Sequence, residues 1–566
     1  MKLKSTLFLL LFYLGLNAQD CATPTALLPL QGNNISALTS NGGDLFWDGF
    51  DGRFIVPADD INAKTSIFAA GLWIGGFDLA DNIKIAAQTY GRSNGKKDYV
   101  AGPLKEFGVT TADDCAAFDK IWSVTKQQVD AHLADFEDNG VIDNPNAGIY
   151  GWPGRDNAFF EQYNGFSWPT EINRFTHAPF WDLNGNDIYE PDQGEYPHHA
   201  ALEDNLFPTQ LTYTIFNDAT IHSESNGDAV RAEIQLCTWN FSCPDNEVLD
   251  NTVFVSYTIQ NASIESIDST FVGLWVDFDL GCVDDDYIGS APDQNAFFVY
   301  NQSNSDGFPG TFTCQFGENS YEENPPAQSV TFLNRSLDKF TYYLNGALNP
   351  PLEQAEPQLP HEFYNYLTGS WRDGTPFTTG GTGYNPSSTD VADHAFPGDP
   401  NDPSSWALIN ETVIAGDYRV LGSHQFGELV PGQYVNIDMA FTFHRQPGLN
   451  HLENVTQMYE DIADLQQSYD SKFADACSNS TLSNQSVIPP SAYQFSPNPT
   501  TGLLDLQLGV LELEQIRILD LSGRELRRWG ASRGRVQLDI SNLPTGMYLM
   551  QLQTQQQSAT EKLIKI

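Results

Sequence analysis

The order of hydrophobic and polar residues predicts a chain made mainly of β-strands. Apolar residues that alternate with polar ones lie on one face of a half-buried strand. Such runs are separated by stretches rich in Gly, Pro, Asn and Ser, which favour turns. The clearest runs in the first 450 residues are 66–74, 211–216, 232–237, 252–259, 271–280 and 435–443. Their spacing is typical of antiparallel β-sandwich domains with few helices.

Two segments have the period of a helix instead. The first is 452–473, where one stripe collects Leu452, Val455, Tyr459, Ile462, Leu465, Tyr469 and Phe473. We expect this helix to pack on the core. The second is 118–136, where one helix face collects Phe118, Ile121, Trp122, Val129, Leu133 and Phe136. The segment 345–410 is rich in Gly, Pro, Asn and Ser, but its aromatic residues indicate long ordered loops rather than a linker.

The length of the chain, 566 residues, predicts more than one domain. We expect a signal peptide at 1–18 and a mixed β/α region with an acidic loop at 19–204. A β-sandwich region with long loops and a C-terminal helix is expected at 205–477. A linker at 478–492 then leads to a small β-sandwich at 493–566.

The N-terminus has the features of a secretory signal peptide. Lys2 and Lys4 are basic, residues 7–16 are almost continuously apolar, and Leu16-Asn17-Ala18 is a cleavage site that leaves Gln19 first. The apolar run is shorter than the roughly 20 residues that span a bilayer. An N-terminal membrane anchor is the alternative. No later segment has the composition of a membrane-spanning helix, so we do not expect an integral membrane protein.

The C-terminal region is predicted to be a small antiparallel β-sandwich. Alternating apolar positions are Leu504, Leu506, Leu508, Ile516, Ile518, Val536, Leu538, Ile540, Tyr548, Met550 and Leu552. Turn sequences at 521–523 and 542–546 separate the runs. An ordinary terminal binding module would have the same pattern.

Specific motifs give this region a family resemblance. It opens with Phe495-Ser-Pro-Asn-Pro-Thr-Thr-Gly502, contains Asp520-Leu-Ser-Gly523 and closes with Lys562-Leu-Ile-Lys-Ile566. In these motifs it resembles the type A C-terminal sorting domain of the type IX (Por) secretion system of Bacteroidetes. The resemblance implies that the secretion machinery recognises residues 493–566, and that the protein is released or held on the outer cell surface. It implies nothing about activity.

Charge is distributed unevenly along the chain. The protein has 28 basic and 73 acidic residues, a net charge of −45. From residue 490 onward there are 8 basic and 7 acidic residues, so the remainder carries 20 against 66. Such a body is repelled by nucleic acid and by anionic membranes, and we expect neither as a partner.

Because 12% of all residues are aromatic, the chain can bury a large core. Excess carboxylates outside the cell favour calcium.

The seven cysteines are spread thinly and form no zinc motif. Export permits disulfides. The candidate pairs are Cys237 with Cys243 and Cys282 with Cys314, with an odd cysteine left over.

A first acidic constellation lies at 182–195. Asp182, Asn184 and Asn186 fit the first three ligand positions of an EF-hand-type calcium loop, and Ile188 offers its backbone carbonyl. The glycine stands at 185 rather than at the sixth position, and the twelfth position is Gln193, so an EF-hand proper is not expected. A looser calcium loop, closed by Glu190, Asp192 or Glu195, fits better. A surface loop built from Asx-turns is the alternative.

A second acidic constellation lies at the end of run 271–280. Alternation places Trp275, Asp277 and Asp279 on one strand face, with the two carboxylates about 7 Å apart at Cα. Three more acids follow, Asp284, Asp285 and Asp286. Such charges repel one another unless they are protonated, solvated or bound to a cation, and calcium suits them. A solvated strand end, or an Asp277–Asp279 pair that hydrolyses glycosides beside a Trp275 platform, are the alternatives.

Other motifs are weak. The pair His198-His199 could bind a transition metal, but we expect a solvated pair. The sequence lacks the metalloprotease, serine-hydrolase and phosphate-loop signatures. The segments 364–374, 380–384 and 396–400 resemble parts of large secreted Bacteroidetes proteins of unassigned function, which implies only a recurring surface module.

Together these features predict a secreted or cell-surface, calcium-stabilised protein that binds partners or has a structural role. Aromatic loops are candidates for contact with glycans or other cell-surface material. The alternative is a secreted hydrolase of polysaccharide that uses Asp277 and Asp279.

Overall fold

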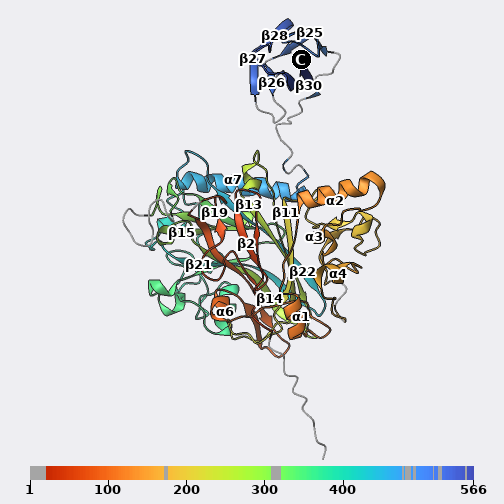
Figure 1. Cartoon of the computed structure of the whole chain (residues 1–566). Helices are drawn as coiled ribbons and strands as arrows, with labels where there is room; N and C mark the ends of the chain where they lie inside the picture. Colours follow the sequence, from red (N-terminus) through yellow and green to blue (C-terminus); the bar gives the residue numbers. More distant parts are fainter. Residues whose placement is uncertain are drawn as a thin grey trace, which may run out of the picture. The chain divides into compact units, whose positions relative to one another are not determined.

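The computed structural model separates the chain into two compact units, residues 1–477 and 478–566 (Figure 1). It describes residues 21–566 apart from 61, 171, 173–175, 205, 308–319, 475–476, 478–485, 488–491, 514, 520–524 and 555–556. The predicted signal peptide, 1–18, lies outside the described residues.

The larger unit contains two antiparallel nine-stranded sheets. The first sheet runs in the order β1 (Leu27–Leu30), β2 (Ser36–Ser40), β3 (Asp44–Leu45), β5 (Thr65–Phe77), β14 (Ile267–Phe278), β21 (Tyr418–Leu429) and β20 (Lys339–Leu344), with β4 (Phe54–Ile55) and β6 (Ile83–Ala87) paired at its side. The second runs in the order β15 (Asp286–Ala291), β16 (Ala296–Asn301), β19 (Ala327–Phe332), β22 (Tyr434–His444), β13 (Thr252–Asn261), β12 (Ala232–Asn240), β11 (Gln210–Asn217) and β7 (Val100–Ala101), with β8 (Trp122–Thr125) paired to β11. The predicted strands are confirmed as β5, β11, β12, β13, β14 and β22.

Strands from before and after residue 205 occur in both sheets. The two regions expected at 19–204 and 205–477 therefore lie in one compact unit. Central strands are paired with partners far away in the sequence, as β5 is with β14. Local patterns of polarity do not reveal such pairing.

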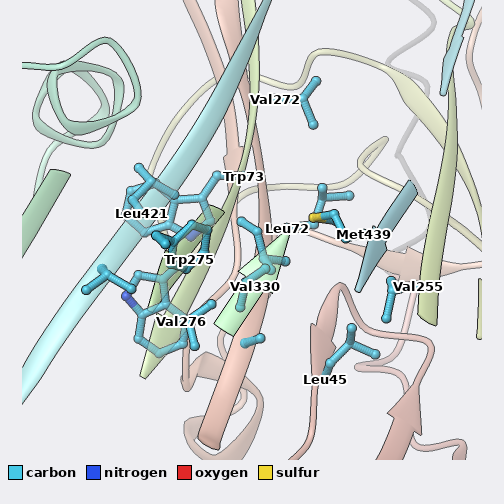
Figure 2. Close-up of a cluster of buried hydrophobic side chains, with 14 of the residues drawn as sticks. Leu45, Leu72, Trp73, Val255, Val272, Trp275, Val276, Val330, Leu421 and Met439 are labelled. Atoms are coloured by element: carbon cyan, nitrogen blue, oxygen red, sulfur yellow. The ribbon is translucent and has the colours of Figure 1, made fainter. Parts of the chain in front are cut away.

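One large hydrophobic core joins the two sheets. It contains Leu72 and Val276 from the first sheet together with Val255, Val330 and Met439 from the second (Figure 2). Burial of this apolar surface is the main driving force for the sandwich.

Helices and short strand pairs cover the sheets. The helices are α1 (Ala112–Ala117), α2 (Lys126–Asn139), α3 (Ala147–Tyr150), α4 (Phe160–Asn164), α5 (Glu247–Asp250), α6 (Pro360–Leu367) and α7 (His451–Asp470). The 3-10 turns are η1 (Gly91–Asn94), η2 (Pro191–Gln193), η3 (Val283–Asp285), η4 (Pro292–Gln294), η5 (Gly346–Leu348), η6 (Leu352–Gln354) and η7 (Leu408–Asn410). Two further pairs are β9 (Phe180–Trp181) with β10 (Tyr196–Pro197), and β17 (Ser305–Asp306) with β18 (Glu322–Glu323). No helix among the described residues has the length and hydropathy that a membrane crossing needs.

The helix α7 confirms the helix predicted at 452–473, whereas the prediction of one helix face from 118 to 136 is wrong in its first part. Phe118 ends α1, and Trp122 begins β8, which pairs with β11. Helix α2 begins only after Thr125, whose side chain accepts a hydrogen bond from the backbone of Gln128 in a capping box. The cap and the strand pairing therefore override the apolar period.

The structure contradicts one of the two predicted disulfides. Cys21 pairs with Cys115, and Cys243 pairs with Cys477, so the proposed Cys237–Cys243 bridge is wrong. Cys237 is a buried free thiol on β12. Cys282 is disulfide-bonded, but its predicted partner, Cys314, lies outside the described residues.

The smaller unit is a β-sandwich, as predicted. One sheet has the order β23 (Ser486–Val487), β30 (Gln557–Lys565), β29 (Gly546–Gln553), β26 (Gln515–Leu519) and β27 (Glu525–Trp529), and the other has the order β24 (Gln494–Ser496), β25 (Leu503–Leu513) and β28 (Ser532–Asp539). Among the described residues of this unit, all strand pairs are antiparallel except β23 with β30. The alternating residues form its core, with Leu504, Ile518, Leu538, Met550 and Leu552 fully buried.

Candidate functional site

The second predicted acidic constellation gathers around the end of β14. Asp277 is paired in register with Arg419 of β21, and Asp417 precedes that strand. Carboxylate oxygens of Asp277, Asp279 and Asp417, which we call the strand-end cluster, lie within 4.8 Å of one another. The Nη1 atom of Arg419 is 2.6 Å from Oδ1 of Asp277 and also contacts Asp417. The Tyr90 hydroxyl donates to Asp277.

Burial controls the protonation of this cluster. Loss of solvent raises the pKa of Asp277, although Arg419 and the Tyr90 hydroxyl act in the opposite direction. The pKa of Asp279 lies well above its ordinary value because of burial and the nearby Asp277 charge. The Arg419 guanidinium therefore does not offset the effect of burial on Asp277 and Asp279.

The proposed sugar platform is absent from the surface. Trp275 is fully buried and packs edge-on against Tyr90, with ring centroids 5.0 Å apart. Asp277 is only 2% exposed. A polysaccharide chain has no stacking face on Trp275 in this structure.

Two of the acids that follow β14 form a separate cluster with a residue that the sequence did not single out. Asp285, Asp286 and Asp306, which we call the buried acidic cluster, are each at most 2% exposed. Asp285 accepts hydrogen bonds from Asn301 Nδ2 and from the Gly307 backbone, both at 3.0 Å. Asp306 comes from β17, and no local pattern in the sequence links it to the other two.

Asp306 and Asp286 are held mainly by backbone donors. Asp306 accepts from the amides of Cys282, at 3.0 Å, and Tyr321. One oxygen of Asp286 accepts from the Leu280 amide at 3.0 Å. The other oxygen, Oδ1, is buried and has no hydrogen-bond partner in the described part of the chain.

The three carboxyls of the buried acidic cluster are hard to ionise. Burial raises the pKa of Asp285 to about 6 and that of Asp306 to about 7. The pKa of Asp286 is raised well above its ordinary value by burial and by the charges of Asp285, Asp306 and Asp279. The influence of Asp279 on Asp286 means that the strand-end and buried acidic clusters are electrostatically adjacent. Asp284 is exposed, and its charge contributes to the raised pKa values of Asp279 and Asp285.

The first predicted constellation is an exposed loop that connects β9 to β10. Both oxygens of Asp182 accept backbone hydrogen bonds, Oδ1 from Gly185 at 2.7 Å and Oδ2 from Asp187 at 2.8 Å. The side-chain amides of Asn184 and Asn186 both donate to Oε2 of Glu190, at 2.9 and 2.6 Å.

The remaining residues of this loop divide between surface and core. Ile188 and Asp192 are exposed, whereas Glu195 is fully buried and accepts from the amides of Leu183 and Glu190. His198 and His199 are also buried, so the expectation of a solvated histidine pair is wrong. They follow β10 directly, and their rings pack against those of Trp181 and Trp239, respectively.

One constellation familiar from hydrolases was not foreseen. Ser329 Oγ lies 2.9 Å from Nε2 of His444, and Nδ1 of His444 lies 2.7 Å from Oδ2 of Asp461. This is the order of a nucleophile, a base and an orienting acid. However, Ser329 and His444 are at most 1% exposed, so no substrate reaches the hydroxyl in this structure. The three side chains connect β19, β22 and α7.

The comparison with known families concerns the smaller unit. Residues 494–566 match the model of the family described as "Secretion system C-terminal sorting domain". This region is a type IX sorting domain. The sorting domain makes this a secreted or outer-surface protein that interacts with the type IX machinery. No curated protein matches the chain.

Solved structures resemble the chain only weakly. The "Putative aldose 1-epimerase (b2544)" of Escherichia coli K12 has a TM-score of 0.21 and 7% identity, over 74% of this chain and 99% of its own. HI1317 has a TM-score of 0.16 and 8% identity, over 74% of this chain and 98% of its own. The BSP domain of a biofilm-associated protein has a TM-score of 0.12 and 8% identity, over 96% of this chain and 82% of its own. These TM-scores are too low to support an inference about fold or activity.

Proposed function

We propose that the exported body is a calcium-stabilised protein with a binding or structural role, and that its acidic clusters hold cations rather than catalyse a reaction. The observation that carries this proposal is the buried Oδ1 atom of Asp286, which has no hydrogen-bond partner among the described residues. It belongs to a carboxyl that lies beside two others, Asp285 and Asp306.

A bound cation would remove an electrostatic conflict. Buried carboxylates without a counter-charge are costly, and they either take up protons or bind a metal. In the described part of the chain no lysine or arginine lies within ion-pair distance of the buried acidic cluster, and the more distant Arg445 guanidinium only partly offsets the effect of burial on Asp306. Calcium takes six to eight oxygen ligands in flexible geometry, and carboxylates that already accept backbone hydrogen bonds still have free lone pairs.

The strand-end cluster supports the same proposal. Its three carboxylates converge within 4.8 Å, with Asp279 able to supply the ligand atoms that Arg419 does not occupy. The alternative of polysaccharide hydrolysis by Asp277 and Asp279 is less well supported, because Asp277 and Trp275 are buried.

The exposed loop between β9 and β10 is the third candidate. Asn184 and Asn186 already converge on Glu190 through their amide groups. Their amide oxygens accept from the backbone amides of Asn186 and Ile188, at 3.0 and 2.8 Å, and each oxygen keeps a second lone pair that a cation could use. With Asp182 and the Ile188 carbonyl, these groups would form an oxygen set of the kind that calcium prefers. Asp192 would close the set from the following turn.

The test is thermal unfolding of the purified protein in calcium and in excess chelator. A ligand at 100 times its Kd stabilises the folded state by about 2.7 kcal/mol per site. We therefore expect chelation to lower the Tm reversibly. Asp286→Asn should lower the Tm in calcium, because a ligand of the cation is lost. In chelator it should not lower the Tm, because the substitution removes a carboxylate that is costly to bury.

The matched control is Asp138→Asn, an exposed carboxylate on α2. It should leave the response to calcium intact. A Tm that is the same in calcium and in chelator would reject the calcium proposal.

A further inference from the structure

The face of the second sheet that points away from the shared core carries a row of polar and ionisable side chains. The register pairs Tyr213 of β11 with Cys237 of β12, Cys237 with Ser256 of β13, and Ser256 with Asp438 of β22. Residues paired directly across strands lie on the same face of a sheet. Their neighbours along the strands point the other way, into the core between the sheets: these are Leu236, Tyr257 and Ile437.

A cavity of about 390 Å³ lies over this row. Its volume falls within the range of small-molecule sites, roughly 300–1,000 Å³. The wall of the cavity includes His199 and, from α7, Tyr469. It also includes Ala200, which is exposed, so the cavity reaches the surface.

Hydrogen bonds fix the polar groups of the wall. Oδ1 of Asp438 accepts from the Ser256 hydroxyl at 2.6 Å, and the Tyr469 hydroxyl also donates to Asp438. The side-chain amide of Asn436 donates to Ser256 Oγ at 3.2 Å. Asn334 in turn donates to Oδ1 of Asn436 at 2.7 Å. Such a network holds its members in place before a ligand arrives.

His199 adds a hydrogen-bond donor. Its Nδ1 accepts from the Ala201 amide at 3.2 Å, which assigns the ring proton to Nε2. Burial lowers the pKa of His199, against the influence of Asp438, so the imidazole is neutral. Its ring lies 4.7 Å from that of Trp239. Among the described residues that line the cavity there is no lysine or arginine.

We propose that this cavity binds a neutral polyhydroxylated small molecule, a single sugar residue being the best match. The Asp438 carboxylate and the lack of basic residues disfavour an anion. The charge of Asp438 is already stabilised by two hydroxyl donors, which reduces its attraction for a cation. The remaining groups are neutral donors and acceptors side by side, and a sugar hydroxyl both donates and accepts. This site is independent of the acidic clusters.

The experiment titrates the full chain with D-glucose, D-galactose, D-mannose, L-fucose and N-acetyl-D-glucosamine, and with choline as a cationic probe. Saturation-transfer NMR detects binding and calorimetry gives the Kd. We expect at least one sugar to bind. Asp438→Asn should weaken that sugar at least tenfold, because the carboxylate orients the network. Thr258→Tyr, which places a ring in the cavity, should abolish binding.

Asp461→Asn is the matched control, since Asp461 is likewise a buried carboxylate but lies outside the cavity wall. It should leave the sugar Kd unchanged, and thermal unfolding verifies that each variant is folded. If Asp438→Asn does not fold, Thr258→Tyr decides. The proposal is overturned if no sugar binds, if choline alone binds, or if the cavity variants bind as the control does.

Discussion

At the scale of single residues, the buried carboxylates are the most unusual feature of this protein. Asp285, Asp286 and Asp306 have raised pKa values although each accepts backbone or amide hydrogen bonds, which favour the charged form. Desolvation therefore outweighs hydrogen bonding at all three. A carboxyl with a raised pKa lowers the stability of the fold as pH rises, whereas a carboxylate in an ordinary ion pair raises it.

The pH dependence can be tested with Asp306→Asn in the presence of chelator. The pKa of Asp306 is about 7 in the folded protein, against about 3.9 for an unperturbed Asp. Between these values the folded state binds more protons, so Asp306 lowers the stability of the parent protein as pH rises from 4 to 7. We expect the fall in Tm over this range to be smaller in the variant. The slope is the readout, because the loss of a side-chain oxygen that accepts from a backbone amide lowers the Tm at every pH.

Asp78→Asn is the control for this measurement. Hydrogen bonds from Asn82 lower the pKa of Asp78 to about 2, so its stabilising effect is lost only in strong acid. It should not change the slope above pH 5. Equal slopes in the parent and in Asp306→Asn would contradict the assignment of Asp306.

At the scale of elements, α7 is held on the second sheet by polar as well as apolar contacts. Val455, Met458 and Ile462 pack on Phe298 and Tyr300 of β16. The hydrogen-bonded series from Ser329 through His444 to Asp461 crosses from the sheet to the helix. We interpret this series as a structural connection, because its serine is inaccessible.

The start of α7 provides a prediction about helix stability. The Asn450 side chain accepts from the amides of Leu452 and Glu453, and Glu453 bonds back to the Asn450 amide. Loss of such a cap costs about 1 kcal/mol. Asn450→Ala should therefore lower the free energy of unfolding in denaturant by about that amount. Gln467→Ala, exposed on the same helix, should change it far less. Similar values for both variants would show that the cap is not important.

At the scale of the whole molecule, the body and the C-terminal region that contains the sorting domain are separate compact units. Each has its own hydrophobic core, and the division falls after Cys477. Cys477 is bonded to Cys243, so the body is closed covalently just before the boundary. The charge has the same division, since nearly all of the acidic excess lies in the body.

A chain that ends at Cys477 should therefore keep the fold of the body. We expect its main unfolding transition, and the loss of Tm on chelation, to match those of the full chain in calorimetry. In the native host, however, this shortened chain should not reach the medium or the cell surface, because the sorting domain is missing. A markedly lower Tm would indicate that the two units stabilise each other.

The sequence by itself determined the strands, helix α7, the sorting domain and the secreted destination. Alternation and helical period are local properties, as are the motifs between Phe495 and Ile566. Local patterns did not predict the end of α1, the Cys243–Cys477 bridge or the union of the regions before and after residue 205. The position of Asp277 and Asp279 at a strand end was foreseen, but not their contact with Asp417 and Arg419.

Only the tertiary structure decided which polar groups meet. Asp306 reaches Asp285 because the chain returns through β17, and Asp438 faces Ser256 because β22 pairs with β13 across 182 residues. Strand register and long-range pairing are set by the burial of the whole core, to which each local pattern contributes only a part. For this reason the destination of the protein can be predicted from its sequence, whereas its acidic clusters and its cavity emerge only in the folded chain.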